Sequence, residues 1–131
     1  VNILIIGNGA REHVFFKLLA ESTTKTNLFS INPNGAIQKL SNPIFKPFSF
    51  SLVKEIIKTS SIEMVIVGPE NPLIDGVYDF IKTDLEINHV SVIGPSQNGA
   101  QLEGSKKFAK DFMFRNNIPT ASSKTFTKET F

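Results

Sequence analysis

The sequence predicts an α/β fold, with an open, mostly parallel sheet and helices on both faces. Four short runs of β-branched and other apolar residues recur along the chain and are continuous rather than alternating, which is typical of strands covered on both faces. Helical patterns lie between these runs, and a glycine directly follows three of them. Strand and helix alternating at this spacing favour an open α/β sheet. We expect strands at Ile3–Ile6, Leu28–Ile31, Met64–Val67 and Val90–Ile93.

Apolar residues at helical spacing predict four helices. The last is expected from Ser105 to Arg115 and to end at Asn116-Asn117, just before Pro119. Residues 32–51, rich in Asn, Pro, Ser and Phe, suggest a loop and a short extra strand near Phe45–Phe48. The expected apolar faces, in chain order, are Val14, Phe15, Leu18 and Leu19; Val53, Ile56 and Ile57; Ile74, Val77, Tyr78 and Ile81; and Phe108, Ala109, Phe112 and Met113.

The composition is that of one ordinary domain. The chain has 131 residues, of which 40% are hydrophobic and 20% charged, so it has room for a core. The net charge of +2 gives no reason to expect nucleic acid or an anionic membrane as a partner. No apolar run is long enough to span a bilayer, and there is no cysteine. We therefore expect a cytoplasmic domain.

Three glycines mark the expected binding region. In open α/β sheets, ligands bind outside the carboxyl ends of the strands, where the connecting loops converge. Gly7, Gly68 and Gly94 each follow a predicted strand. The loops Gly7–His13, Gly68–Asp75 and Gly94–Ser105 are therefore expected to line one crevice.

The first loop, Gly7-Asn8-Gly9-Ala10-Arg11-Glu12-His13, resembles the start of a dinucleotide fingerprint but fails two tests. Glu12 replaces the third glycine, and the second strand ends in Asn32 rather than in an acidic residue. A glycine turn that opens a helix still favours an anion, and Arg11 can add a charge-assisted contact to a phosphate. The alternative is a tight turn with Glu12 favourable in the first helical turn and Arg11 solvated. His13 is expected to pack or cap rather than to act as a base.

The other two loops carry fewer signals. Pro69 and Pro72 bracket Glu70 and Asn71, which limits the entropy that these side chains lose on binding. A rigid carboxylate at a strand end is suited to accept hydrogen bonds from sugar hydroxyls, although a turn that leads into a helix explains the same residues. In the third loop Ser105 separates Gly104 from Lys106, so the phosphate-loop motif is incomplete.

Four blocks of sequence resemble the family of phosphoribosylamine–glycine ligases, also called glycinamide ribonucleotide synthetases. The first is Ile3–His13, similar to the family's strand and G-x-G-G-R-E-H loop, with Ala10 for one glycine. The second is Val67–Leu73, similar to V-G-P-E-x-P-L. The third comprises Gly94–Ser96 and Ala100–Met113, similar to G-P-S…A-x-L-E-G-S-K-x-F-A-K-D-F-M. The fourth is Ile118–Ala121, similar to I-P-T-A.

The resemblance implies a reaction. In this family ATP phosphorylates glycine, and the amine of 5-phosphoribosylamine attacks the glycyl phosphate, so that ADP and phosphate leave in a step of purine biosynthesis. The family belongs to the ATP-grasp superfamily, in which a Rossmann-like amino-terminal domain holds the substrate and later lobes hold ATP with Mg²⁺ or Mn²⁺. The resemblance implies that Lys106 faces the nucleotide. Residues for the substrate phosphate and ribose would be Gly7, Gly9, Ala10, Arg11, Glu70, Asn71, Pro72 and Leu73.

The resemblance also implies a division of the chain. Residues 1–102 correspond to the substrate-binding domain, and residues 103–131 to a linker helix and the start of the ATP-grasp region. The metal ligands and most of the ATP pocket are expected beyond Phe131, with no catalytic residue or metal ligand inside the chain. We expect no ligase activity from this chain alone, and its oligomeric state stays open. Two departures put contacts in doubt: Ala10 would be strained if its φ were positive, and the loop Asn32–Ala36 has an altered order.

Other interpretations remain open. The chain could come from another purine-pathway ATP-grasp enzyme, such as a carboxylase or a formyltransferase. It could be a non-catalytic module that binds a sugar phosphate or a nucleotide. It could also be a scaffold domain whose glycine loops are only turns.

Overall fold

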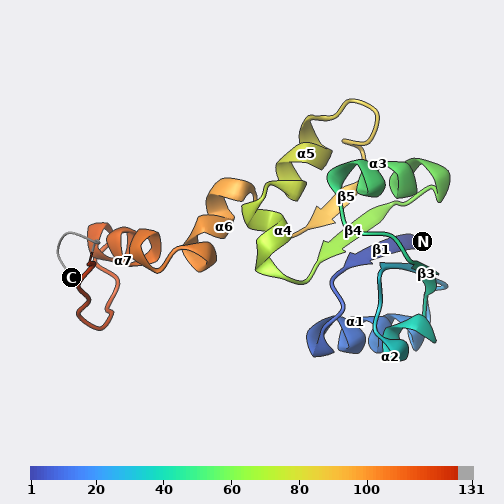
Figure 1. Ribbon diagram of the computed structural model, residues 1–131, viewed down its shortest axis with the longest axis horizontal. Helices are drawn as coiled ribbons and strands as arrows, with labels where there is room; N and C mark the ends of the chain where they lie inside the picture. The colour runs from blue at the N-terminus through green and yellow to red at the C-terminus, as the bar shows by residue number, and fades with distance from the viewer. Residues whose placement is uncertain (127–131) are drawn as a thin grey trace.

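Five short strands form one parallel sheet in the computed structural model, which describes residues 1–126 (Figure 1). The strand order is β3-β2-β1-β4-β5, so the first strand lies at the centre. Continuous apolar runs form these strands because both faces of the sheet are covered, as the sequence predicted. The strands are β1 (Asn2–Ile6), β2 (Asn27–Ile31), β3 (Asn42–Ile44), β4 (Met64–Val67) and β5 (Ser91–Ile93).

Helices cover both faces of the sheet, as predicted (Figure 1). On one face Ile3 and Ile5 pack with Phe16 and Ile37 of the first two helices. On the other face Leu4 belongs to a larger core with apolar residues of the next four helices. The helices are α1 (Ala10–Ala20), α2 (Gly35–Gln38), α3 (Phe50–Thr59), α4 (Glu70–Ile74), α5 (Val77–Thr83), α6 (Gln97–Gly104) and α7 (Lys106–Arg115).

The extra strand of the middle segment lies earlier than expected. It is β3, Asn42–Ile44, rather than Phe45–Phe48, and it forms one edge of the sheet. The Asn32 N–H donates to the Ile44 carbonyl (2.8 Å), so Ile44 faces β2. Pro43, one position earlier, therefore turns its backbone nitrogen away from β2, where a proline is tolerated.

Of the four residues predicted to form the apolar face of α1, only Leu19 packs against the core. Phe16 is fully buried, whereas Val14 and Leu18 are more than half exposed. Glu12, Phe16 and Leu19 follow a spacing of four and three residues and form the buried stripe instead. The glycine turn before Ala10 and the burial of Glu12 set the rotation of this helix. Apolar residues at positions 14, 15, 16, 18 and 19 surround it, so periodicity alone could not choose the inner face.

The helices around the third and fourth predicted strands differ in detail from the prediction. Ile74, Val77, Tyr78 and Ile81 do pack on one core, but Gly76, with φ 97°, divides their helix into α4 and α5. A helix, α6, replaces most of the loop expected from Gly94 to Ser105. α7 begins and ends as predicted, with Ser105 as its N-cap, and Figure 1 shows it extended away from the sheet beyond α6.

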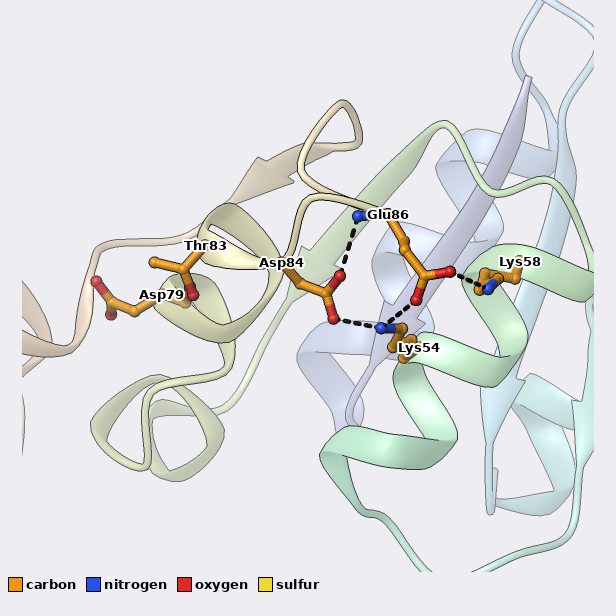
Figure 2. Close-up of polar contacts among 6 residues, drawn as sticks. All are labelled: Lys54, Lys58, Asp79, Thr83, Asp84 and Glu86. Carbon is orange, nitrogen blue, oxygen red and sulfur yellow. Dashed lines mark hydrogen bonds and ion pairs between the residues drawn. The ribbon is translucent and has the colours of Figure 1, made fainter.

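Charged side chains hold the segment after α5 against α3. Lys54 contacts Asp84 (2.6 Å) and Glu86 (2.5 Å), while Lys58 contacts the other oxygen of Glu86 (2.6 Å). Figure 2 shows the two lysines projecting from α3 toward the two carboxylates. The Glu86 N–H also donates to Asp84 (3.0 Å), so the two acidic residues brace each other. Among residues 1–126, no helix is both long and apolar enough to cross a membrane.

Candidate functional site

A cavity of about 290 Å³ lies at the carboxyl ends of β1 and β2, beside the start of α4. This is the edge of a parallel sheet at which ligands are expected. No lining side chain is charged, and three of them are asparagine amides. The lining residues are Ile6, Gly7, Asn8, Ile31, Asn32, Phe48, Pro69, Asn71 and Pro72.

The amino-terminal end of α1 lies next to Gly7 and Asn8 of this cavity. Gly7, with φ 119°, makes the turn that opens the helix. The Gly9 N–H donates to the Glu12 carboxylate at 2.7 Å. Within residues 1–126, the N–H groups of Ala10 and Arg11 meet no protein acceptor. These two groups and the positive end of the helix dipole are therefore available to an anion.

Ala10 is not strained at this turn. It is the first residue of α1, and its φ is not positive. A glycine is therefore not required at this position for backbone reasons, and the departure from the family motif leaves the turn intact.

Arg11 and Glu70, from the two loops, face each other. Arg11 Nη2 lies 3.8 Å from Glu70 Oε2, and their side chains are 69% and 41% exposed. An exposed pair at this distance contributes little to stability, so both groups remain free to turn toward a ligand. The structure thus brings together a cation suited to phosphate and a carboxylate suited to hydroxyls.

The remaining residues of the second loop divide between cavity and core. Asn71 and Pro72 line the cavity. Leu73 is only 6% exposed, belongs to the core, and packs so closely on Gly94 that a Cβ there would lie 2.8 Å from it. Leu73 therefore supports the loop from behind rather than facing the cavity.

Asparagines connect the first loop to the segment after β2. Asn8 Nδ2 donates to the Asn32 carbonyl (3.3 Å), and Asn34 Nδ2 donates to the Asn8 carbonyl (2.6 Å). Asn34 also caps α2 by accepting from Ala36 and Ile37. The loop whose altered order raised doubt is therefore built against the cavity, and Asn32 lines it.

The third predicted loop and Lys106 lie elsewhere. None of the residues from Gly94 to Ser105 lines the cavity. Lys106 is the exposed first residue of α7, which Figure 1 shows apart from the sheet edge where the cavity lies. The structure therefore brings two of the three loops together and leaves Lys106 outside that group.

A larger hollow, of about 490 Å³, lies at the opposite end of the sheet. Its lining includes Ser61, Ile62 and Glu63, which directly precede β4, together with Glu86 and His89. The amino ends of parallel strands are not where such folds bind ligands, and no glycine loop reaches this hollow. We therefore assign the site to the smaller cavity.

Several residues at the cavity or beside it, among them Asn8, Asn32, Phe48 and Glu12, were not among the site residues predicted from the sequence. Asn32 directly follows a predicted strand. Gly7 and Gly68 were selected for that same position, so Asn32 could have been selected as well. Glu12 stands three residues after Gly9, the spacing of a capping box, which could have indicated its bond to Gly9. Phe48 lies in the segment of residues 32–51, and no local sequence signal indicated that it would line the site.

The site suits a ligand with an anionic head and a neutral body rich in hydroxyl groups. The anion would meet Arg11 and the end of α1, and the body would meet the amides of the cavity. Among residues 1–126, no group of three His, Asp or Glu side chains could hold a metal ion.

Comparisons with known proteins agree on one family of purine biosynthetic enzymes. Residues 1–103 match the family described as phosphoribosylglycinamide synthetase, N domain. The chain is 41% identical to a phosphoribosylamine–glycine ligase of Listeria monocytogenes over 97% of its length, which is 30% of that ligase. It is 40% identical to a bifunctional purine biosynthetic protein of Pichia angusta, of which it covers 16%. The chain therefore spans less than a third of each of these relatives.

A solved structure supports the fold. The crystal structure of a phosphoribosylamine–glycine ligase from Thermotoga maritima is similar over 93% of this chain, with a TM-score of 0.60. The matched part is 26% of that chain, and the identity is 24%. At this identity the likeness shows a shared fold.

Proposed function

The chain belongs to the phosphoribosylglycinamide synthetase N-domain family, and from this membership we propose that it binds the phosphoribosyl group within a phosphoribosylamine–glycine ligase. The proposal rests on one arrangement: Arg11 and the free N–H groups of α1 stand beside a neutral, amide-lined cavity. The phosphate would bind at Arg11, Ala10 and the end of α1. The ribose hydroxyls would meet Glu70 and Asn71.

In the proposed full-length ligase, residues 1–102 hold 5-phosphoribosylamine, and residues from 103 onward begin the part that holds ATP. Lys106 would face the nucleotide there, ATP and Mg²⁺ or Mn²⁺ would be the cofactors, and glycine the second substrate. The proposed boundary falls within α6, close to the end of the family match at residue 103. Residues 127–131 of the second part lie outside the described residues. A cytoplasmic location, consistent with the absence of cysteine, is part of this proposal.

Titration with ribose 5-phosphate tests the proposal, because this compound keeps the sugar and phosphate of the substrate. We expect binding to the 131-residue chain, with shifts by NMR in the amides of residues 7–11 and of Gly68, Glu70 and Asn71. Arg11→Ala should weaken binding by about tenfold, the effect of one lost hydrogen bond to a charged group. The other arginine, Arg115, is exposed on α7, so Arg115→Ala is the matched control and should bind as the unchanged chain does.

NAD and AMP distinguish the alternatives in the same titration. Tighter binding of NAD than of ribose 5-phosphate would contradict the proposal and favour a dinucleotide module. No response to any of the three compounds would favour a scaffold domain.

A further inference from the structure

Glu12 is a buried carboxylate that the proposed function does not use. It is 4% exposed, although its neighbour Arg11 has a largely exposed side chain. Charged side chains are almost never fully buried unless they are paired. The place of Glu12 in the first turn of α1 accounts for part of its stability, because the positive end of the helix dipole favours a carboxylate.

The contacts of Glu12 join the two loops of the site. Its Oε2 accepts from the Gly9 N–H of the first loop (2.7 Å). Its side chain fills the space in front of two glycines, one from each loop. A Cβ built on Gly7 would lie 2.7 Å from Glu12 Cγ, and one built on Gly68 would lie 2.1 Å from Glu12 Oε1. The backbones of Gly7 and Gly68 therefore both pack directly against the Glu12 side chain.

One oxygen of Glu12 has no partner. Oε1 is buried and meets no hydrogen-bond donor among residues 1–126. Leaving a buried polar atom unpaired is costly, and such atoms are rare in folded proteins. A side chain needed only to fill this space would be less costly if it were neutral. Because burying Oε1 without a partner costs free energy, we look for the role of Glu12 in the length of its side chain and in the two loops that it contacts.

We propose that Glu12 is a positioning residue that sets the loop of residues 7–11 against the loop of residues 68–72. In doing so it sets the distance between Arg11 and Glu70. No backbone hydrogen bond joins these two residues, so their separation depends on how the loops pack. The identity of the ligand rests on the proposed function, whereas the coupling of the loops does not. Small displacements of binding groups cost large factors in affinity, so this coupling matters to the site.

Two substitutions of Glu12 test the proposal. Glu12→Ala removes both the acceptor for Gly9 and the side chain that separates Gly7 from Gly68. We expect affinity for ribose 5-phosphate to fall about tenfold, as for one lost hydrogen bond to a charged group. Amide exchange should quicken at Gly68 and Asp75, whose N–H groups donate to the carbonyls of Ile6 and Asn71, while the central strands β1 and β4 stay protected. Glu12→Gln keeps the length and an acceptor, so it should restore both properties to within about threefold of the unchanged chain.

Glu21→Ala is the matched control, because Glu21 is an exposed carboxylate at the opposite end of the same helix. It should leave affinity and loop exchange unchanged. If Glu12→Ala lowers only the melting temperature and leaves both readouts as they are, the positioning role is overturned.

Gly68→Ala gives a second route that keeps Glu12 in the chain. The new methyl group would displace the carboxylate, so it should reproduce the faster amide exchange at position 68 and at Asp75. In the double variant the two changes should be clearly less than additive, since each disturbs the same contact. Additive effects would overturn the proposal. If the unchanged chain fails to bind ribose 5-phosphate, the proposed function fails, and the exchange measurements still decide the role of Glu12.

Discussion

Phe16 is fully buried in the face of the sheet that α1 covers, whereas Phe15 beside it is 40% exposed. The two side chains have the same size and belong to the same helix, yet only Phe16 packs with Ile3 and Ile5 of β1. Their contribution to stability should therefore differ sharply. This pair is a direct check on the rotation of α1.

Phe16→Ala should lower the free energy of unfolding by about 3–5 kcal/mol, the usual cost of emptying a buried aromatic site. Phe15→Ala should change it by less than about 1 kcal/mol, because its ring is already partly hydrated. Urea denaturation followed by circular dichroism measures both. If Phe16→Ala does not fold, the milder Phe16→Leu should still cost about 1–2 kcal/mol. Equal losses at the two positions would mean that α1 is rotated differently.

The sequence predicted the site best where chemistry and position coincide. Gly7, Arg11 and Glu70 each lie in the loop or first helical turn that follows a strand and carry a recognisable property, and Arg11 and Glu70 face each other in the structure. Glu12 looked like an ordinary residue of a first helical turn. Its burial depends on Gly68, a residue 56 positions later, and no local pattern contains that contact.

At the scale of elements, the strands were the most predictable part. Runs such as Met64–Val67 are apolar at every position, and burial on both faces leaves few other structures for them. The helices were less predictable, because their ends depend on single backbone conformations. Gly76 in the left-handed region separates α4 from α5, and α6 contains two glycines and only weak apolar periodicity.

The ion pairs between α3 and the segment after α5 make the free energy of unfolding depend on pH in the acidic range. Hydrogen bonds from Lys54 and Lys58 lower the pKa of Glu86 from 4.5 to about 2, and Lys54 and the Glu86 backbone N–H lower the pKa of Asp84. A carboxylate whose pKa is lower in the folded chain stabilises that state above its unfolded pKa. This stabilisation is lost as the pH falls through the folded pKa.

Acid denaturation of Lys54→Met tests this dependence. The unchanged chain should lose this stabilisation between about pH 4.5 and pH 2, the range set by Glu86. The variant should show a shallower decline over the same range, and added salt should bring the two curves closer because the pairs lie at the surface and Glu86 is exposed to solvent. Lys17→Met, which removes an exposed lysine of α1, should keep the original slope. An unchanged slope in Lys54→Met would show that these pairs do not couple to folding.

At the scale of the whole molecule, the cavity and the last helix lie apart. The cavity lies at the carboxyl ends of β1 and β2. α7 leads away from the sheet (Figure 1). α7 carries Phe114 with 84% of its surface exposed. The relatives that match this chain extend much further than it does.

The 131-residue chain should therefore release no phosphate from ATP in the presence of glycine, the amine substrate and Mg²⁺. Formation of an acyl phosphate requires groups that stabilise the developing charge on the transferring phosphoryl group. This chain covers only 30% of the Listeria ligase that it resembles. A phosphate-release assay checks this, with the longer Listeria ligase as the positive control. Glycine-dependent release by this chain would contradict the expectation.

The proline in β3 has a consequence for how copies of the molecule meet. An edge strand offers unpaired N–H and C=O groups on which a strand of another chain could add. Pro43 stands at the centre of this three-residue edge and turns its nitrogen outward, where it has no hydrogen to donate. The edge is thus both short and interrupted, a feature that natural sheets use against aggregation. Pro43 thereby protects a molecule whose apolar strands would otherwise invite association.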